Sequence, residues 1–440
     1  SLFSFILHKG LSLFSFILHK GLSFFFILHK GLLYFLSFCT RVFFIFFHSA
    51  QGSSLFSFIL HKGLSLFSFI LHKGLSFFFI LHKSLLYFFS FCTRVFLYFL
   101  LFCTRVFFIV FHSAQESSLF SFILHKGLLY FLLFYTRVFF IFFHSAQGSF
   151  FIFFYSAQGS FFIFFYSTQG VFFIFFHSAQ GSFFIFFHSA QGSFFIFFYS
   201  TQGSSLFSFI LHKSLLYFLS FCTRVFFIFF HSAQGSFFIF FHSAQGSFFI
   251  FFHSAQGVFF IFFHSAQGSF FIFFHSTQGS SLFSFILHKG LLYFLSFCTR
   301  VFFIFFHSAQ GSSLFSFILH KGLLYFLSFC TRDFLYFLSF CTRVLLYFLS
   351  FCTRVLLYFL LFYTRVFFIF FHSAQGSFFI FFHSTQGSSL FSFILHKGLS
   401  LFSFILHKGL LYFLSFCTRD FLYFLSFYTR VFLYFLSFCT

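Results

Sequence analysis

Apolar residues occur along the whole chain in runs of about five to eight, and a short polar segment ends each run. The run at residues 150–154 reads Phe-Phe-Ile-Phe-Phe, and Tyr-Ser-Ala-Gln-Gly follows it. This alternation recurs about every 11 residues, with occasional slips. Short runs that are rich in strand-forming residues predict β-strands. The segments with a glycine predict turns between them.

If the chain is ordered, we therefore expect short β-strands or hairpins in a repeat array, in which neighbouring repeats bury one another's faces. The alternative is a set of hydrophobic α-helices, because an 11-residue repeat is close to three helical turns. Phe has only a middling helix propensity, and a glycine in most repeats costs about 1 kcal/mol relative to alanine. Strands are therefore favoured over helices.

The same pattern also predicts a packing problem. Successive Phe residues in a strand point to opposite faces, so both faces of each strand are apolar. Runs without charge or proline are typical of aggregating segments. Near-identical repeats can slip past one another by one unit without losing contacts, which creates many near-equivalent minima. We therefore expect no unique stable fold, poor agreement between copies, and self-association or aggregation of an expressed chain.

Three repeated words make up nearly the whole chain. They are Phe-His-Ser-Ala-Gln-Gly-Ser at residues 47–53, Phe-Ile-Leu-His-Lys-Gly-Leu at residues 5–11 and Ser-Phe-Cys-Thr-Arg-Val at residues 37–42. Lys, Arg, Asp and Glu are absent between Arg137 and Lys213, yet the words continue through this stretch. We therefore interpret residues 1–440 as a single low-complexity tandem-repeat region without a domain boundary.

The three words can be one DNA word read in three frames. By the standard code, the string TTTCATTCTGCACAAGGGTCTT gives the first word from its first base, the second word from its second base and the third word from its third base. Along the chain the words also change in one cyclic order. A protein selected for its side chains has no reason to satisfy this constraint.

Residues that depart from the words fit single-base changes. Glu116 replaces the usual glycine (GGG to GAG), and Asp333 and Asp420 replace valine (GTC to GAC). Ser84 replaces glycine (GGT to AGT), and Thr168 replaces alanine (GCA to ACA). We therefore interpret the chain as the conceptual translation of a DNA tandem repeat, without a selected function.

The composition agrees with a thymine-rich repeat: Phe supplies 120 residues, whereas Pro, Met and Trp are absent. The formal net charge of +21 comes from Lys and Arg residues spread singly along the words, so it forms no concentrated basic block. We expect no nucleic-acid partner, because aromatic side chains beside cations can stack on bases only where they form a platform. Since the chain begins at Ser1, we expect a fragment or a reading frame without an initiator.

A hydrophobic, membrane-embedded repeat protein is the first alternative, because 60% of the residues are hydrophobic and the mean hydropathy is +1.05. The best windows are residues 96–111 and 355–371, which contain Arg105 and Arg365. About twelve apolar residues contribute roughly −5 kcal/mol to insertion, against about +3 kcal/mol for a central Arg. A lipid membrane is thus a candidate partner. The localisation is otherwise undetermined.

The chain shows no constellation typical of an enzyme, a metal site or a cofactor site. Pairs such as His48 and Ser49 would need an orienting acid and an oxyanion site. Only three acids occur among 440 residues, and Cys39 has no defined partner. The 25 His residues usually recur one repeat apart, as do neighbouring cysteines such as Cys330, Cys341 and Cys352, and the 10 Cys residues include no close pair of the kind that binds zinc. We therefore expect no enzyme, no catalytic, metal or cofactor-binding residue, and no specific partner.

A self-assembling, Phe-rich structural material is the second alternative function. The strand-forming runs would then stack on one another, as in cross-β assemblies. An upstream secretion signal would support this interpretation, but no signal-peptide pattern opens the present sequence.

Overall fold

The computed structural model consists almost entirely of β-strands and divides into two compact units, Ser1–Cys222 and Thr223–Thr440. The strands of the first unit are β1 (Leu2–Leu7), β2 (Leu11–Leu18), β3 (Leu22–Cys39), β4 (Phe43–Leu60), β5 (Gly63–Leu81), β6 (Ser84–Cys103), β7 (Phe107–Ser113), β8 (Ser118–Leu124), β9 (Gly127–Phe134), β10 (Phe139–His144), β11 (Gln147–Tyr155), β12 (Gln158–Tyr166), β13 (Gln169–His177) and β14 (Gln180–Cys222). Those of the second unit are β15 (Phe226–His231), β16 (Gln234–His242), β17 (Gln245–His253), β18 (Gln256–Cys298), β19 (Phe302–Tyr363), β20 (Phe367–Ser384), β21 (Gly387–Leu395), β22 (Gly398–Leu406), β23 (Gly409–Cys417), β24 (Asp420–Tyr428) and β25 (Val431–Cys439). The structure describes these strands together with residues 8–10, 168, 407–408 and 429–430.

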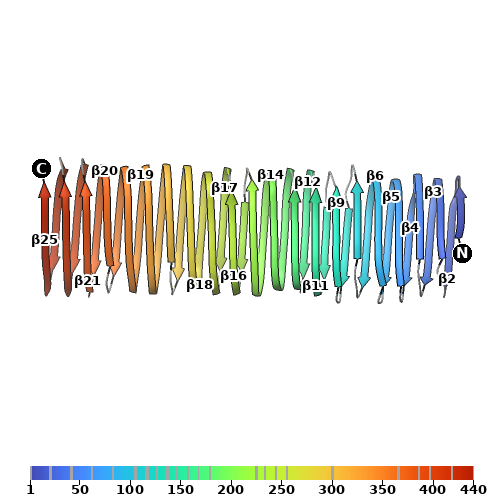
Figure 1. Cartoon of the computed structure of the whole chain (residues 1–440), viewed down its shortest axis with the longest axis horizontal. Helices are drawn as coiled ribbons and strands as arrows, with labels where there is room; N and C mark the ends of the chain where they lie inside the picture. The colour runs from blue at the N-terminus through green and yellow to red at the C-terminus, as the bar shows by residue number, and fades with distance from the viewer. Residues whose placement is uncertain are drawn as a thin grey trace. The chain divides into compact units, whose positions relative to one another are not determined.

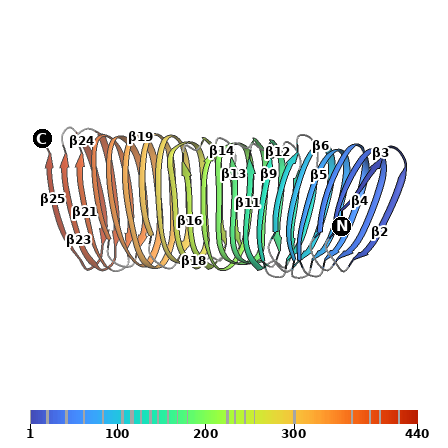
Figure 2. The same cartoon turned by 45° about the vertical axis from the view of Figure 1, so that its right-hand side comes forward.

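Each unit is a β-solenoid in which successive turns stack side by side (Figure 1). Strand β10 pairs with β12 and strand β11 with β13, so consecutive strands belong to opposite faces of the same turn. Gln147 lies opposite Gln169 and Leu2 lies opposite Ser23, so one turn takes 22 or 21 residues. In the view of Figure 2 the turns appear as flattened loops. Two 11-residue repeats therefore make one turn.

The expectation of short strands in a repeat array is confirmed, whereas the expectation of hairpins is wrong. Every pairing between the described strands is parallel, as for β11 with β13 and for β16 with β18. Consecutive strands such as β10 and β11 lie on opposite faces, and the hydrogen-bonded neighbour of each comes one full turn later. Helices, the alternative interpretation, are not found among the described residues.

We expected no unique stable fold, but the structure is an ordered array of repeats. Copies in β11 and β13 match residue for residue, from Gln147 opposite Gln169 to Tyr155 opposite His177. Poor agreement between copies was therefore a wrong expectation for the described strands. Parallel pairing in register explains the order, because it places identical side chains on one another and lets rings and amides form continuous rows.

The core of each unit lies between the two faces and consists mainly of Phe rings. In β13, Phe172, Ile174 and Phe176 are fully buried, whereas Phe173 and Phe175 point outward. Rings of the same face stack, as for Phe154 and Phe176, whose centroids lie 4.4 Å apart. Rings of opposite faces meet edge to face, as for Phe165 and Phe172 at 5.1 Å. Both arrangements are favoured by the ring quadrupole.

The apolar runs of repeats that carry each of the three words fold in the same way, and β14 contains one run of each kind. Their buried inward residues are Phe194, Ile196 and Phe198 in the repeat with the first word, Phe207, Phe209 and Leu211 in the repeat with the second, and Leu216, Phe218 and Ser220 in the repeat with the third. Each run thus alternates inward and outward residues with the period of a strand. This similarity is what the interpretation as a thymine-rich DNA repeat predicts, because thymine at the second codon base specifies only the apolar residues Phe, Leu, Ile, Met or Val.

The glycines at the ends of the repeats are required by close contact between turns. Gly170 has a φ of +137°, and a Cβ atom there would lie 1.8 Å from the carbonyl oxygen of Gly148. No side chain fits in that space, and an L-residue adopts this φ only with strain. The predicted role of glycine in the turns is confirmed at these positions.

Replacing Thr168 with valine is expected to stabilise the first unit locally by about 1–2 kcal/mol. The Thr168 side chain is fully buried, and its hydroxyl has no hydrogen-bond partner among the described residues. Valine keeps the shape and removes the unpaired polar group. The measurement is amide hydrogen exchange of the peptide at residues 168–177, whose Thr-Gln-Gly-Val start occurs once in the chain.

The matched control for this substitution is Thr429→Val. The Thr429 hydroxyl is exposed and donates a hydrogen bond to the main-chain oxygen of His407 at 2.9 Å. Its removal is expected to leave stability unchanged or slightly lower. Faster exchange in Thr168→Val than in the parent chain would contradict the assignment of an unpaired hydroxyl.

Candidate functional site

The residues considered for catalysis in the sequence are only partly described by the structure. His48 is exposed on β4. The side chains of Ser49, Cys39 and the three acids Glu116, Asp333 and Asp420 lie outside the described part of the chain. Among the described residues, no group of three or more His, Cys, Asp or Glu side chains is placed to hold a metal ion. The absence of an enzyme site stays a prediction.

The outward side chains of the strands form continuous aromatic rows, with one ring for each turn. In the first unit, Phe151 stacks on Phe173 at 4.9 Å between ring centroids, and Phe173 stacks on Phe195 at 4.5 Å. In the second unit, Phe249 stacks on Phe271 at 4.8 Å. We call these the outer aromatic rows. Their members are Phe151, Phe173, Phe195 and Tyr217 on one face of the first unit, Phe140, Phe162 and Phe184 on its other face, Phe227, Phe249, Phe271 and Tyr293 on one face of the second unit, and Phe238 and Phe260 on its other face.

Rows of imidazoles run beside the aromatic rows. His231, His253 and His275 are exposed and stack with centroid separations of 5.0 and 5.1 Å. His242 and His264 do the same on the other face, at 5.0 Å. Neighbours in a row lie one turn apart in a stack. The ligands of a single metal ion, by contrast, surround one point.

Glutamine side chains form a third kind of row at the corners. The Gln147 amide donates a hydrogen bond to Gln169 at 3.4 Å, and the Gln169 amide donates to Gln191 at 3.5 Å. In the second unit Gln234 donates to Gln256 at 3.4 Å. Such amide ladders are a feature of stacked identical chains, and here one chain makes them with its own copies. These hydrogen bonds connect a corner to the corresponding corner of the neighbouring turn.

The cations that the structure describes lie away from the outer aromatic rows. Lys213 and Lys289 are exposed at corners, between one apolar run and the next. Lys408 and Arg430 are exposed between strands β22 and β23 and between β24 and β25. The rows therefore form apolar bands on the faces, and the described positive charges lie at their margins.

The described residues of the two windows considered for membrane insertion are in β-strands. Residues 96–103 belong to β6 and 107–111 to β7, and residues 355–363 belong to β19 and 367–371 to β20. Within the described part of the chain, no helix reaches the length and hydrophobicity needed to cross a bilayer.

Sequence reasoning missed the aromatic, imidazole and glutamine rows. The 11-residue period is visible in the sequence, but it relates repeats on opposite faces. The rows need partners two repeats apart, and only the 22-residue turn brings these together. Comparison of the chain with protein families, with known proteins and with solved structures found no match.

Proposed function

We propose that this chain is a repetitive structural protein without enzymatic activity, whose molecular property is self-association through the outer aromatic rows. The single observation that carries the proposal is the presence of these apolar rows on both faces of each unit, where they run over successive turns of the described strands. Two copies have the same spacing of about 4.8 Å between turns, so the rows of one copy match the rows of another. The partner is therefore a second copy of the chain.

The exposed area of the outward aromatic rings is large enough to drive such association. Phe153 and Phe229, which point outward two residues after the row members Phe151 and Phe227, keep 37% of their surface exposed. Full coverage of an aromatic side chain buries about 150–250 Å². Covering the exposed third of one ring therefore contributes roughly 1–2 kcal/mol at about 25 cal/mol per Å². About ten such rings offset the association cost of about 4–15 kcal/mol.

We also propose that the order of side chains derives from a DNA tandem repeat and was not selected for a specific biochemical activity. The common DNA string behind the three words supports this origin. The test compares the nucleotide sequences of the copies. Synonymous and non-synonymous differences are expected at equal frequency, and a marked excess of synonymous differences would show selection on the protein.

Introducing lysines into the outer aromatic rows is expected to weaken self-association at least tenfold. The variant is Phe151→Lys/Phe195→Lys/Phe249→Lys, which places charges on the apolar bands of β11, β14 and β17. A lysine there must lose water when a second copy covers the face, which is costly without a partner. The measurement is the chain concentration at which sedimentation velocity first detects assemblies.

The matched control is Gln147→Lys/Gln191→Lys/Gln245→Lys. It adds the same charge to the same three strands, but at the corners, and is expected to associate like the parent chain. Circular dichroism verifies that both variants keep their β-structure. Equal weakening by both variants would show that net charge alone governs association. No weakening by either would rule out the outer aromatic rows as the surface of self-association.

A further inference from the structure

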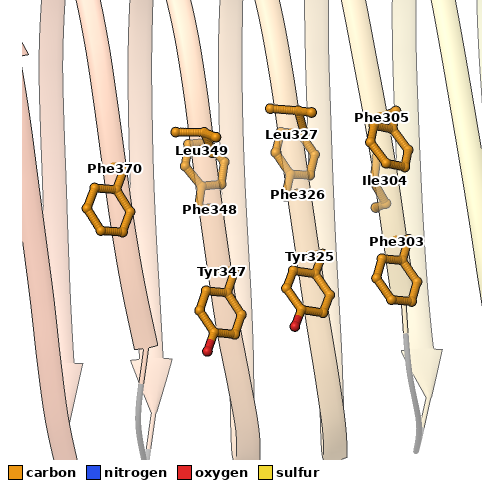
Figure 3. Close-up of a pocket in the computed structure, with 10 residues that line it drawn as sticks. All are labelled: Phe303, Ile304, Phe305, Tyr325, Phe326, Leu327, Tyr347, Phe348, Leu349 and Phe370. Atoms are coloured by element: carbon orange, nitrogen blue, oxygen red, sulfur yellow. The ribbon is translucent and has the colours of Figure 1, made fainter.

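An apolar recess of about 460 Å³ interrupts the regular outer face of the second unit on strands β19 and β20. One wall is the row Phe303, Tyr325 and Tyr347, and the opposite wall contains Leu327 and Leu349 (Figure 3). The two tyrosine hydroxyls point away from the leucines (Figure 3). The buried residues Ile304, Phe326 and Phe348 lie between the two walls and bound the floor.

The recess exists because the repeated word changes at two successive turns. At four successive turns, one outward position is occupied by Phe305, Leu327, Leu349 and Phe370. Leucine is shorter than phenylalanine, so two neighbouring leucines leave a gap in the row. Phe305 and Phe370 are 45% and 41% exposed and close the two ends of the gap. The recess therefore has a floor, two side walls and two ends.

Its dimensions select a flat ligand. Turns of a β-solenoid lie about 4.8 Å apart, so the two end rings, three turns apart, are separated by about 14 Å. The volume falls within the range of about 300–1,000 Å³ that is usual for small-molecule sites. A fused system of three or four aromatic rings fits this length when it lies along the direction in which the turns stack.

The walls select an uncharged aromatic molecule. Phe303, Tyr325 and Tyr347 stack with interplanar angles of 6° and 7°, so the row presents ring edges to the recess. Ring edges carry partial positive charge and attract the negative face of another aromatic system. The leucine side chains cover the other face of the ligand. None of the described residues that line the recess is charged, so an ionic ligand would lose its water without compensation.

We propose that this recess binds uncharged, flat, polycyclic aromatic molecules. The site is independent of self-association, because it is complete within one chain. The probe is Nile red, an uncharged four-ring dye whose emission shifts to the blue in apolar surroundings. It is titrated into the full chain at nanomolar concentration, after sedimentation velocity has verified that no assemblies are present at that concentration. A saturable blue-shifted signal is expected.

The discriminating variant is Leu327→Phe/Leu349→Phe, which fills the recess with the residue already present at both of its ends. Dye affinity is expected to fall at least tenfold. The matched control, Leu425→Phe/Leu436→Phe, adds the same two rings at positions that are 51% and 52% exposed and do not line the recess. The control is expected to bind dye like the parent chain.

A second variant tests the aromatic wall of the recess. It gives a result even if Leu327→Phe/Leu349→Phe fails to fold. Tyr325→Leu/Tyr347→Leu is expected to weaken binding at least fivefold, whereas Tyr325→Phe/Tyr347→Phe keeps the ring edges and the affinity. Equal dye binding by the parent, the filled variant and the control would overturn the proposal, because the dye would then bind the apolar faces in general. Such a result at nanomolar concentration would leave the association proposal untouched.

Discussion

Replacing Phe176 with alanine is expected to lower the local free energy of unfolding around β13 by about 4 kcal/mol. The Phe176 ring is fully buried and stacks on Phe154 at 4.4 Å and on Phe198 at 4.6 Å. It also meets Phe161 and Phe183 of the opposite face edge to face, at 6.1 and 4.9 Å. Alanine removes all four ring contacts and leaves a cavity that the stacked turns cannot close by collapsing.

The matched control is Phe175→Ala, the same substitution one residue earlier on the same strand. Phe175 points outward, and its nearest rings, Phe153 and Phe197, lie at 6.2 Å and are tilted. Its replacement is expected to cost about 1 kcal/mol, the usual size of an aromatic pair contact. Hydrogen exchange of the peptide at residues 168–177 measures both variants. Similar losses for the two would contradict the assignment of inward and outward faces.

Replacing Gly170 with alanine is expected to destabilise the first unit by at least about 3 kcal/mol, because it combines backbone strain with a steric clash. The new Cβ atom would lie 1.8 Å from the carbonyl oxygen of Gly148. This oxygen belongs to the backbone of the neighbouring turn and cannot move aside as a flexible side chain could. The turns must separate locally, which breaks the glutamine hydrogen bond between Gln147 and Gln169 at the same corner. The measurement is the guanidinium midpoint of the β-sheet circular dichroism.

The control substitution Gly10→Ala separates the effect of backbone strain from that of the steric clash. Gly10 has a φ of +125°, close to that of Gly170, but no atom lies within 4 Å of its would-be Cβ atom. It therefore has the backbone strain without the clash, and we expect a loss of about 1–2 kcal/mol. A Gly170→Ala variant no less stable than Gly10→Ala would mean that the turns are not in the close contact described.

The strands and the turn glycines of this fold could be predicted from the sequence, because both depend on local chemistry. Runs such as residues 150–154 have the composition of strands, and Gly159 and its equivalents mark the corners. Parallel pairing was not predicted, because the local pattern is the same for a hairpin and for a solenoid corner. The choice depends on whether the next strand lies beside the first or across the core from it.

The outer aromatic rows and the recess could not be predicted from the sequence, for a related reason. An 11-residue period does not say which copies are neighbours, and stacking of Phe151 on Phe173 needs the 22-residue turn. The recess further requires that Leu327 and Leu349 lie on adjacent turns of one face, between Phe305 and Phe370. The ladders of identical side chains disfavour a slip by one or a few residues, which would place unlike side chains on one another, whereas a slip by a whole repeat would preserve them.

The equivalence of the three words in β14 has a consequence for translation. A ribosome that slips by one base on this template, or a base inserted by replication slippage, ordinarily ruins the downstream protein. Here the downstream residues keep an alternating inward-facing set that is mainly Phe, Leu and Ile, with a buried serine such as Ser220 in repeats of the third kind. If the proposed origin from thymine-rich tandem DNA is correct, a transcript read in any of the three phases is expected to yield a β-solenoid with apolar faces.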